Sequence, residues 1–145
     1  MKIIDSEINI IFCLEGKNIE LNEISDRLGI IPSEIRTPDD WPEAIKNPKV
    51  ELPDYLKPRY TWNLELGYKK CSLVEDRFDE MLDILREKEN IINELKEKFK
   101  LNIGFVVGIH AQHDSCNMPG IFLTQEVISF VASIGADIAF DMYLD

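Results

Sequence analysis

The chain has few cysteines and no long apolar run. Cys13, Cys71 and Cys116 are its only three cysteines and lie far apart, without a CxxC pair, so they predict reduced thiols rather than a disulfide framework. No apolar stretch approaches the roughly 20 residues that cross a bilayer. Asp5 and Glu7 interrupt the N-terminal segment where a signal peptide would be apolar. We therefore expect a cytoplasmic protein.

Familiar catalytic motifs are also missing. The sequence has no glycine-rich phosphate loop, no GxSxG elbow, no HExxH helix and no P-loop. We therefore predict no cofactor and favour a non-catalytic protein over a familiar enzyme.

Basic residues are scarce. Sixteen Lys and Arg stand against 27 Asp and Glu, a net charge of −11, and residues 101–145 contain no Lys or Arg. Such a chain repels nucleic acid and anionic membranes, so we expect neither as a partner. It attracts basic proteins. The sequence leaves the oligomeric state open.

Hydrophobic periodicity predicts four main strands and a series of helices in one domain, residues 1–145. A fifth, short strand is expected at 121–123. The phase break near Lys88 allows two helices there, or one broken helix. The main strands are expected at 7–15, 60–66, 102–111 and 136–144. The helices are expected at 20–28, 72–85, 91–99 and 125–134.

The segment 32–58 holds six of the seven prolines, which remove backbone donors and block helix and inner strand. We expect a long loop with one helical turn near 41–45. Trp41 and Tyr55 are expected to be exposed on it and available to a partner.

Strands alternating with helices indicate an α+β fold. Because the strands alternate apolar and polar residues, we expect a two-layer sandwich with a four- to five-stranded sheet and helices mainly on one face. Strand phase predicts a buried Trp62 near Leu64, Phe12, Phe105 and Phe140. In the last strand it turns Ile138, Phe140, Met142 and Leu144 inward. It turns Asp137, Asp141 and Asp145 outward, onto an acidic surface.

The residues His110, His113, Asp114 and Cys116 are the one local cluster of metal-binding or nucleophilic types. A zinc site needs three or four converging ligands, and in a continuing strand His110 and His113 point to opposite faces. We therefore predict a polar turn and no metal site. A cleft near His110, His113 and Trp62 remains the alternative, as a small-molecule-binding or catalytic site.

Four segments in order resemble the uncharacterised bacterial family known as domain of unknown function 4279. They are residues 21–32, with a helix ending in Leu-Gly-Ile and a proline; 60–64, with a strand tryptophan; the helix 72–85; and 120–143. The family usually has a lysine–glycine pair after the proline, where this chain has Thr37-Pro38-Asp39-Asp40. The resemblance implies a small α+β fold and no established activity.

Two hypotheses for function follow. The first is a non-catalytic protein-interaction domain that binds a basic protein through Trp41, Tyr55, Asp137, Asp141 and Asp145. Its specific form is an immunity protein that neutralises a basic bacterial toxin, since acidic surfaces steer basic partners. The second is the small-molecule-binding or catalytic cleft described above.

Overall fold

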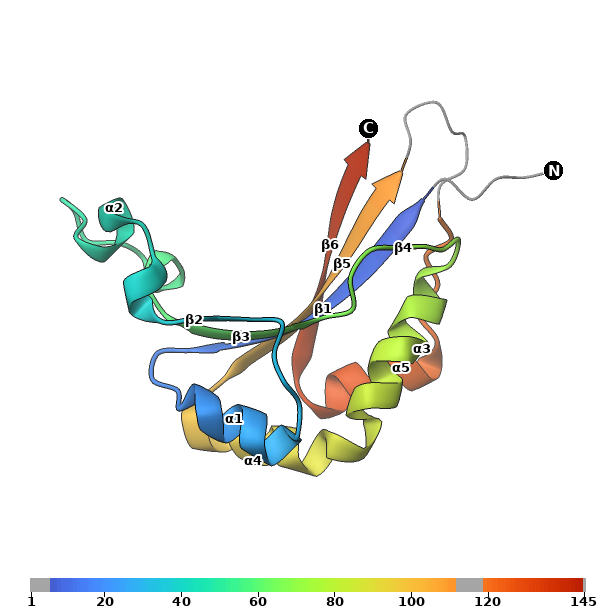
Figure 1. The fold of residues 1–145 in the computed structure, drawn as a ribbon, viewed down its shortest axis with the longest axis horizontal. Coiled ribbons are helices and arrows are strands. Elements are labelled where there is room, and N and C mark those ends of the chain that lie inside the picture. Colours follow the sequence, from blue (N-terminus) through green and yellow to red (C-terminus); the bar gives the residue numbers. More distant parts are fainter. Residues whose placement is uncertain (1–5, 112–118, 145) are drawn as a thin grey trace.

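One sheet forms the first layer of the protein and helices form the second (Figure 1). The computed structural model describes residues 6–111 and 119–144, and within them the sheet has six strands. The strands are β1 (Glu7–Gly16), β2 (Glu34–Arg36), β3 (Tyr60–Glu65), β4 (Lys69–Lys70), β5 (Asn102–Ala111) and β6 (Ala136–Leu144). The helices are α1 (Leu21–Leu28), α2 (Glu43–Lys46), α3 (Val74–Leu85), α4 (Glu89–Phe99) and α5 (Gln125–Ser133).

The sheet is mixed, with strand order β2-β3-β1-β5-β6, and β4 pairs with β1 beyond the end of β3. Only β5 and β6 are parallel among the described pairs. The α+β class is confirmed, but the expected four to five strands are wrong. The missed strands, β2 and β4, have three and two residues, too short to show periodicity, and β2 lies in the proline-rich segment.

Helix ends follow their sequence signals. Gly29 and Gly135 follow α1 and α5 with φ of 68° and 61°, the left-handed conformation that favours glycine. The Thr124 hydroxyl accepts a hydrogen bond from the Val127 amide at 3.2 Å, which caps α5. A 3₁₀ turn, Arg86–Lys88, separates α3 from α4 at the predicted break.

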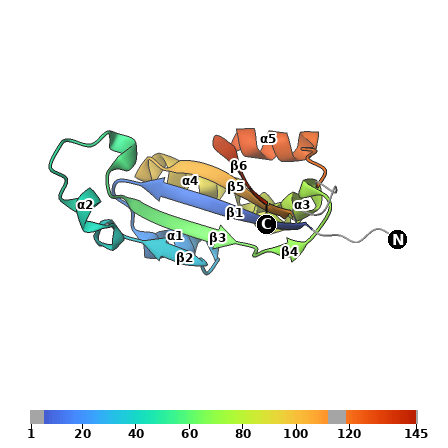
Figure 2. The same ribbon diagram turned by 90° about the horizontal axis from the view of Figure 1, so that it is seen from above.

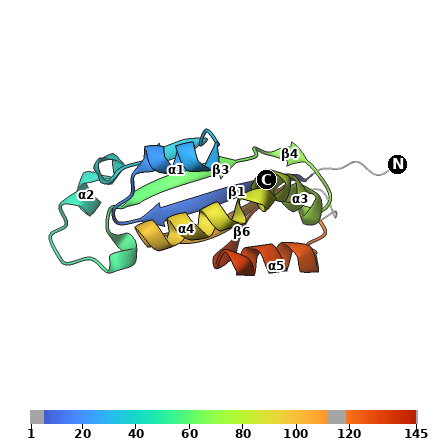
Figure 3. The ribbon, with the colours of Figure 1, turned by 90° about the horizontal axis from the view of Figure 1, so that it is seen from below.

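The core lies between the sheet and α1, α3, α4 and α5 (Figure 3). Trp62 is fully buried, as predicted, and its indole N–H donates to Ser25 Oγ of α1 at 2.9 Å. The Phe12 ring lies 6.3 Å from the Trp62 ring and 5.3 Å from that of Phe105. This part of the phase assignment is confirmed.

The inner face of β6 is not buried as predicted. Phe140, Met142 and Leu144 are 38%, 49% and 69% exposed, and of this face of β6 only Ala136 and Ile138 pack against the core. The prediction failed because β6 is the edge strand, and the helical layer does not cover its C-terminal half. The strand predicted at 121–123 is also wrong, since that segment makes no ladder and only Gly120 bridges to Leu73.

No helix in the described ranges is long and apolar enough to cross a bilayer.

Candidate functional site

Figure 2 shows the strands from the side away from the helices, and the strand register fixes which residues lie in a row on this face. Glu7 of β1 pairs with His110 of β5, which pairs with Tyr143 of β6. In the row two residues along, Asn9 pairs with Gly108, which pairs with Asp141. Since alternate strand residues share a face, both rows lie on this uncovered face.

A β-bulge joins β3 to β4 on this face. Ile11 pairs with Glu65, and Ile8 pairs with Lys69. Three residues, 66–68, therefore lie opposite two, 9–10, which is the pattern of a bulge. Gly67 within it has φ of 90°, a conformation that other residues adopt only with strain.

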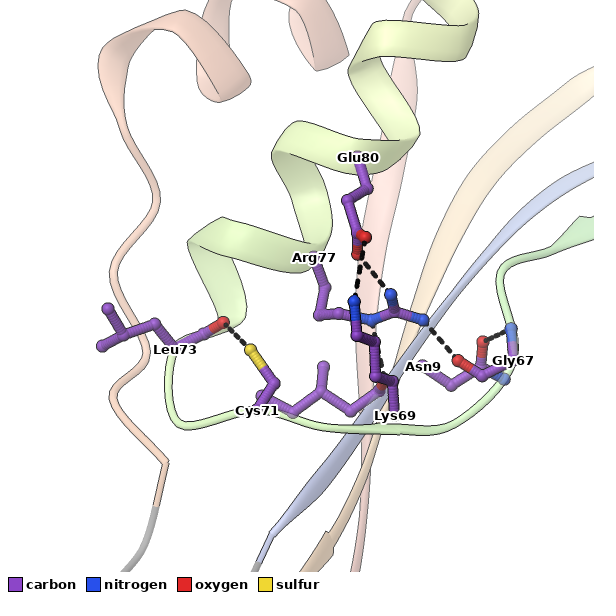
Figure 4. A network of polar contacts seen from close by, with 8 residues as sticks. Asn9, Gly67, Lys69, Cys71, Leu73, Arg77 and Glu80 are labelled. Carbon is purple, nitrogen blue, oxygen red and sulfur yellow. Dashed lines mark hydrogen bonds and ion pairs between the residues drawn. The ribbon is translucent and has the colours of Figure 1, made fainter. Parts of the chain in front are cut away.

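A buried arginine holds the bulge from the helical side (Figure 4). Arg77 of α3 is 5% exposed, and its guanidinium donates to the Ile8 carbonyl at 3.0 Å and to the Gly67 carbonyl. Glu80 on the next turn pairs with Arg77. The Asn9 side chain accepts from the Gly67 amide at 2.8 Å. These bonds satisfy a buried charge and fix the chain at Gly67.

The fixed bulge lays Tyr68 over the sheet at Gly108. A Cβ on Gly108 would collide with the Tyr68 hydroxyl end, whereas a Cβ on Gly104 would meet its nearest atom at an ordinary 3.7 Å. Gly108 therefore makes room for the Tyr68 ring, and the bulge puts that ring there.

Three aromatic rings meet at this point. The Tyr68 ring contacts His110 edge-on, with centroids 5.1 Å apart, and the His110 ring stacks on Tyr143 at 5.0 Å. Tyr68 and Tyr143 keep 43% and 48% of their surface exposed. The rings form a platform on which a flat or cationic group can lie.

Carboxylates surround the platform. Burial against the sheet raises the pKa of Tyr68, and the charges of Tyr143, Glu65, Asp141 and Glu7 add to the effect. We call Glu7, Glu65, Tyr68, His110, Asp141 and Tyr143 the aromatic–acidic patch. Its chemistry suits a Lys or Arg side chain, because aromatic faces and carboxylates both attract cations.

The partner-binding residues predicted from sequence divide between two places. Asp137 and Asp141 are exposed on the uncovered face, Asp137 opposite Gly104 and Asp141 opposite Gly108. Asp145 lies outside the described residues. Trp41 and Tyr55 lie on the 37–59 loop at the far end of the molecule (Figure 1).

Trp41 is tied down by its own loop. Its indole N–H donates to the Arg59 carbonyl at 2.9 Å, and the Arg59 guanidinium lies 4.7 Å from the ring centre. Tyr55 is 74% exposed. The structure therefore does not bring the loop aromatics to the acidic strand face.

The alternative cleft is not assembled from the expected residues. Trp62 points into the core and His110 lies on the uncovered face, so the two are on opposite sides of the sheet. His113, Asp114 and Cys116 lie outside the described residues. Within residues 6–111 and 119–144, no three His, Cys, Asp or Glu side chains come together in a group that could hold a metal ion.

A groove of about 1030 Å³ lies instead at the end of β1, between the 37–59 loop and the end of α4. Five of its lining residues are basic, Lys17, Lys57, Arg59, Lys98 and Lys100, and two are acidic, Glu15 and Asp54. The hydrogen bond from Lys57 and the charge of Lys17 lower the pKa of Asp54. The groove is a basic region on an acidic chain.

Sequence reasoning missed Tyr68, Tyr143, Glu7 and Glu65 as site residues. The available signal was glycine: Gly67 ends the alternation of β3, and Gly108 occupies the outward face of a strand, where a missing side chain indicates close approach of another group. Tyr68 is that group only because the bulge shifts the strand by one residue, and the periodicity of the sequence does not show this shift.

Comparison with known proteins gives one match. A family model described as Domain of unknown function (DUF4279) matches residues 6–145, which confirms the resemblance noted in the sequence. No curated protein and no solved structure matches the chain.

Proposed function

This chain belongs to the DUF4279 family, and we propose that it is a non-catalytic protein-interaction domain that binds a basic protein on the uncovered face of its sheet. The aromatic–acidic patch carries this proposal. An Arg or Lys side chain lying on the exposed Tyr68 and Tyr143 rings gains about 0.5–2 kcal/mol from the cation–π interaction. The negative charges of Glu7, Glu65 and Asp141 act on Tyr68 and would attract such a cation.

The charge of the whole chain supports the same proposal. A net charge of −11 raises the rate at which a basic partner meets the protein, and salt screens this effect. Asp137 extends the acidic surface along β6. The steering field and the local patch therefore favour the same class of partner.

The specific form of the proposal is an immunity protein that neutralises a basic bacterial toxin by covering its positive surface. An open sheet face that carries carboxylates and aromatic anchors suits such occlusion. Co-expression with the basic protein that the domain captures tests this form: growth restored by the domain supports it, and a partner that is harmless on its own contradicts it.

Quantitative capture from a host lysate tests the interaction itself. The baits are the wild type, Asp137→Asn/Asp141→Asn, and the matched control Asp79→Asn/Glu87→Gln, which removes the same charge from exposed positions on the helical side. We expect the wild type and the control to retain a basic protein in near-equimolar amount, and the β6 variant to retain much less. Equal capture by all three baits would exclude the uncovered face as the binding surface.

A second candidate function, binding of a small polyanion, is favoured by the basic groove. Trp41 stacks on Arg59 at its edge and supplies a fluorescence reporter. Titration with tripolyphosphate should change this fluorescence in the wild type and less in Lys100→Gln. The same response to sodium sulfate at equal ionic strength would show general screening and remove this candidate.

A further inference from the structure

Strand β6 is an open sheet edge in the part of the chain that the structure describes. It has nine residues and pairs with β5 on one side, and no other described strand pairs with it. Monomeric proteins usually guard such edges with charged side chains, especially Lys, or with Pro, bulges, short strands or a covering segment. The charged residues of β6 are Asp137 and Asp141, and both lie on the face away from the helices. β6 has no Lys and no Pro, and its ladder with β5 is continuous from Ala136 to Leu144.

Exposed apolar side chains gather around this edge. Of 15 exposed large hydrophobic residues among those described, seven lie between residues 121 and 144. Four are on β6 itself: Phe140, Met142, Tyr143 and Leu144. Ile128 is on α5, which runs along the same side of the molecule (Figures 2 and 3), and Ile121 and Phe122 precede that helix. A surface of this kind normally marks an interface.

We infer that β6 pairs antiparallel with β6 of a second copy of this chain, which joins the two sheets across a two-fold axis. A two-fold axis presents the same surface from both copies, so the strand must be complementary to itself. In an antiparallel pair, opposed residues lie on the same face of the sheet, whereas neighbouring residues of one strand lie on opposite faces. The two-fold axis must therefore pass through a residue and not between two residues.

Repulsion between carboxylates disfavours some of these registers. Centring on Ala139 opposes Asp137 with Asp141 of the second copy, and centring on Asp141 opposes Asp141 with itself. Like charges directly opposed are unfavourable. Centring on Phe140 opposes Asp137 with Tyr143 and Asp141 with Ala139, so no carboxylate faces another.

The apolar residues of β6 also favour the register centred on Phe140. Phe140 is the middle residue of β6, so this register pairs the whole strand. It opposes Phe140 with Phe140, Ile138 with Met142 and Ala136 with Leu144, all on the helical face of the sheet, where Phe140, Met142 and Leu144 are exposed in one copy. The second copy therefore supplies the cover for the β6 side chains that the sequence predicts to be buried.

Pairing also satisfies the outward backbone donors and acceptors of β6. Because opposed residues share a face, both aromatic–acidic patches lie on one continuous surface, which would present two sites to a partner. The pairing itself does not depend on the proposed function, since a chain that binds no basic protein still has this edge.

Sedimentation equilibrium of the untagged chain at about 1–100 μM tests the proposal. We expect a mass of about twice 16.8 kDa at the upper concentrations. Phe140→Lys puts two ammonium groups opposite each other at the axis and should raise the dimer dissociation constant at least about a hundredfold. The control Val50→Lys, at an apolar loop position that is 71% exposed, should leave the constant unchanged.

Cross-linking tests the register. Oxidation of Ile138→Cys/Met142→Cys should give a covalent dimer, because these positions oppose each other only between chains. The parent with its native cysteines is the background. A chain that is monomeric up to about 100 μM, a dimer unchanged by Phe140→Lys, or no cross-linking above background would overturn the proposal.

Discussion

Arg77 shows how one buried residue builds the surface on the other side of the sheet. It reaches from α3 to the carbonyls of Ile8 and Gly67, so the guanidinium and the bulge depend on each other. We expect Arg77→Met to lower the free energy of unfolding by about 2–4 kcal/mol, since two carbonyls lose a charged donor. Urea denaturation measures this.

The matched control is Arg86→Met. Arg86 pairs with exposed carboxylates, and its loss should change the unfolding free energy by less than about 0.5 kcal/mol. A similar cost at both positions would show that Arg77 does not brace the bulge.

Cys13 is predicted to be an unreactive thiol. Burial in the sheet, assisted by the charge of Glu15, raises its pKa to about 11. The test uses a Cys71→Ser/Cys116→Ser background at pH 8. Cys13 should react with a thiol reagent about a hundredfold more slowly in the folded protein than in protein unfolded in urea, because the thiolate is the nucleophile and the raised pKa makes it scarce in the folded protein. Equal rates in the two states would contradict this assignment.

At the scale of elements, the contact between β3 and α1 depends on Trp62. Its ring fills the space beside Phe12, and its N–H bonds Ser25 of α1. Trp62→Ala should cost about 3–5 kcal/mol of stability, as other large-to-small aromatic changes in cores do. An unchanged melting temperature would mean that β3 has the opposite phase.

Long, regular elements were predictable from sequence, and short or edge elements were not. β1, β5 and β6 have nine or ten residues each, enough for alternation to show, and Gly29, Gly135 and Thr124 mark helix ends by local chemistry. β4 has two residues and exists only because the bulge carries the chain on along β1. The prediction that the inner face of β6 is buried failed for another reason. Alternation shows which side chains share a face, but it does not show whether another layer covers that face.

At the scale of the whole molecule, we expect charge to govern the rate at which the protein associates with the proposed basic partner. The −11 net charge and the carboxylates of the uncovered face would both attract the proposed basic partner. The association rate should fall as salt rises, and Asp137→Asn/Asp141→Asn should flatten that dependence. Stopped-flow mixing with the captured partner measures both slopes, and identical slopes would show that these aspartates serve only solubility.

The candidate site was only partly predictable. Asp137 and Asp141 followed from the period of a strand, so their shared face was expected. Tyr68 joins His110 and Tyr143 through pairings among β1, β4, β5 and β6, and residues 68 and 143 are far apart in the chain. Trp41 was expected to be a free anchor, but a hydrogen bond to the Arg59 carbonyl holds it, and composition does not reveal such a bond.

Binding through the aromatic–acidic patch is tested by comparing the dissociation constants of the captured basic partner for Gly108→Ala and Gly104→Ala, measured by isothermal titration. Both add one methyl group to the uncovered face of β5, but only the methyl at 108 displaces the Tyr68 ring. We expect binding at least about tenfold weaker for Gly108→Ala, about 1.4 kcal/mol, and wild-type binding for Gly104→Ala. Equal dissociation constants for the two variants would contradict this expectation.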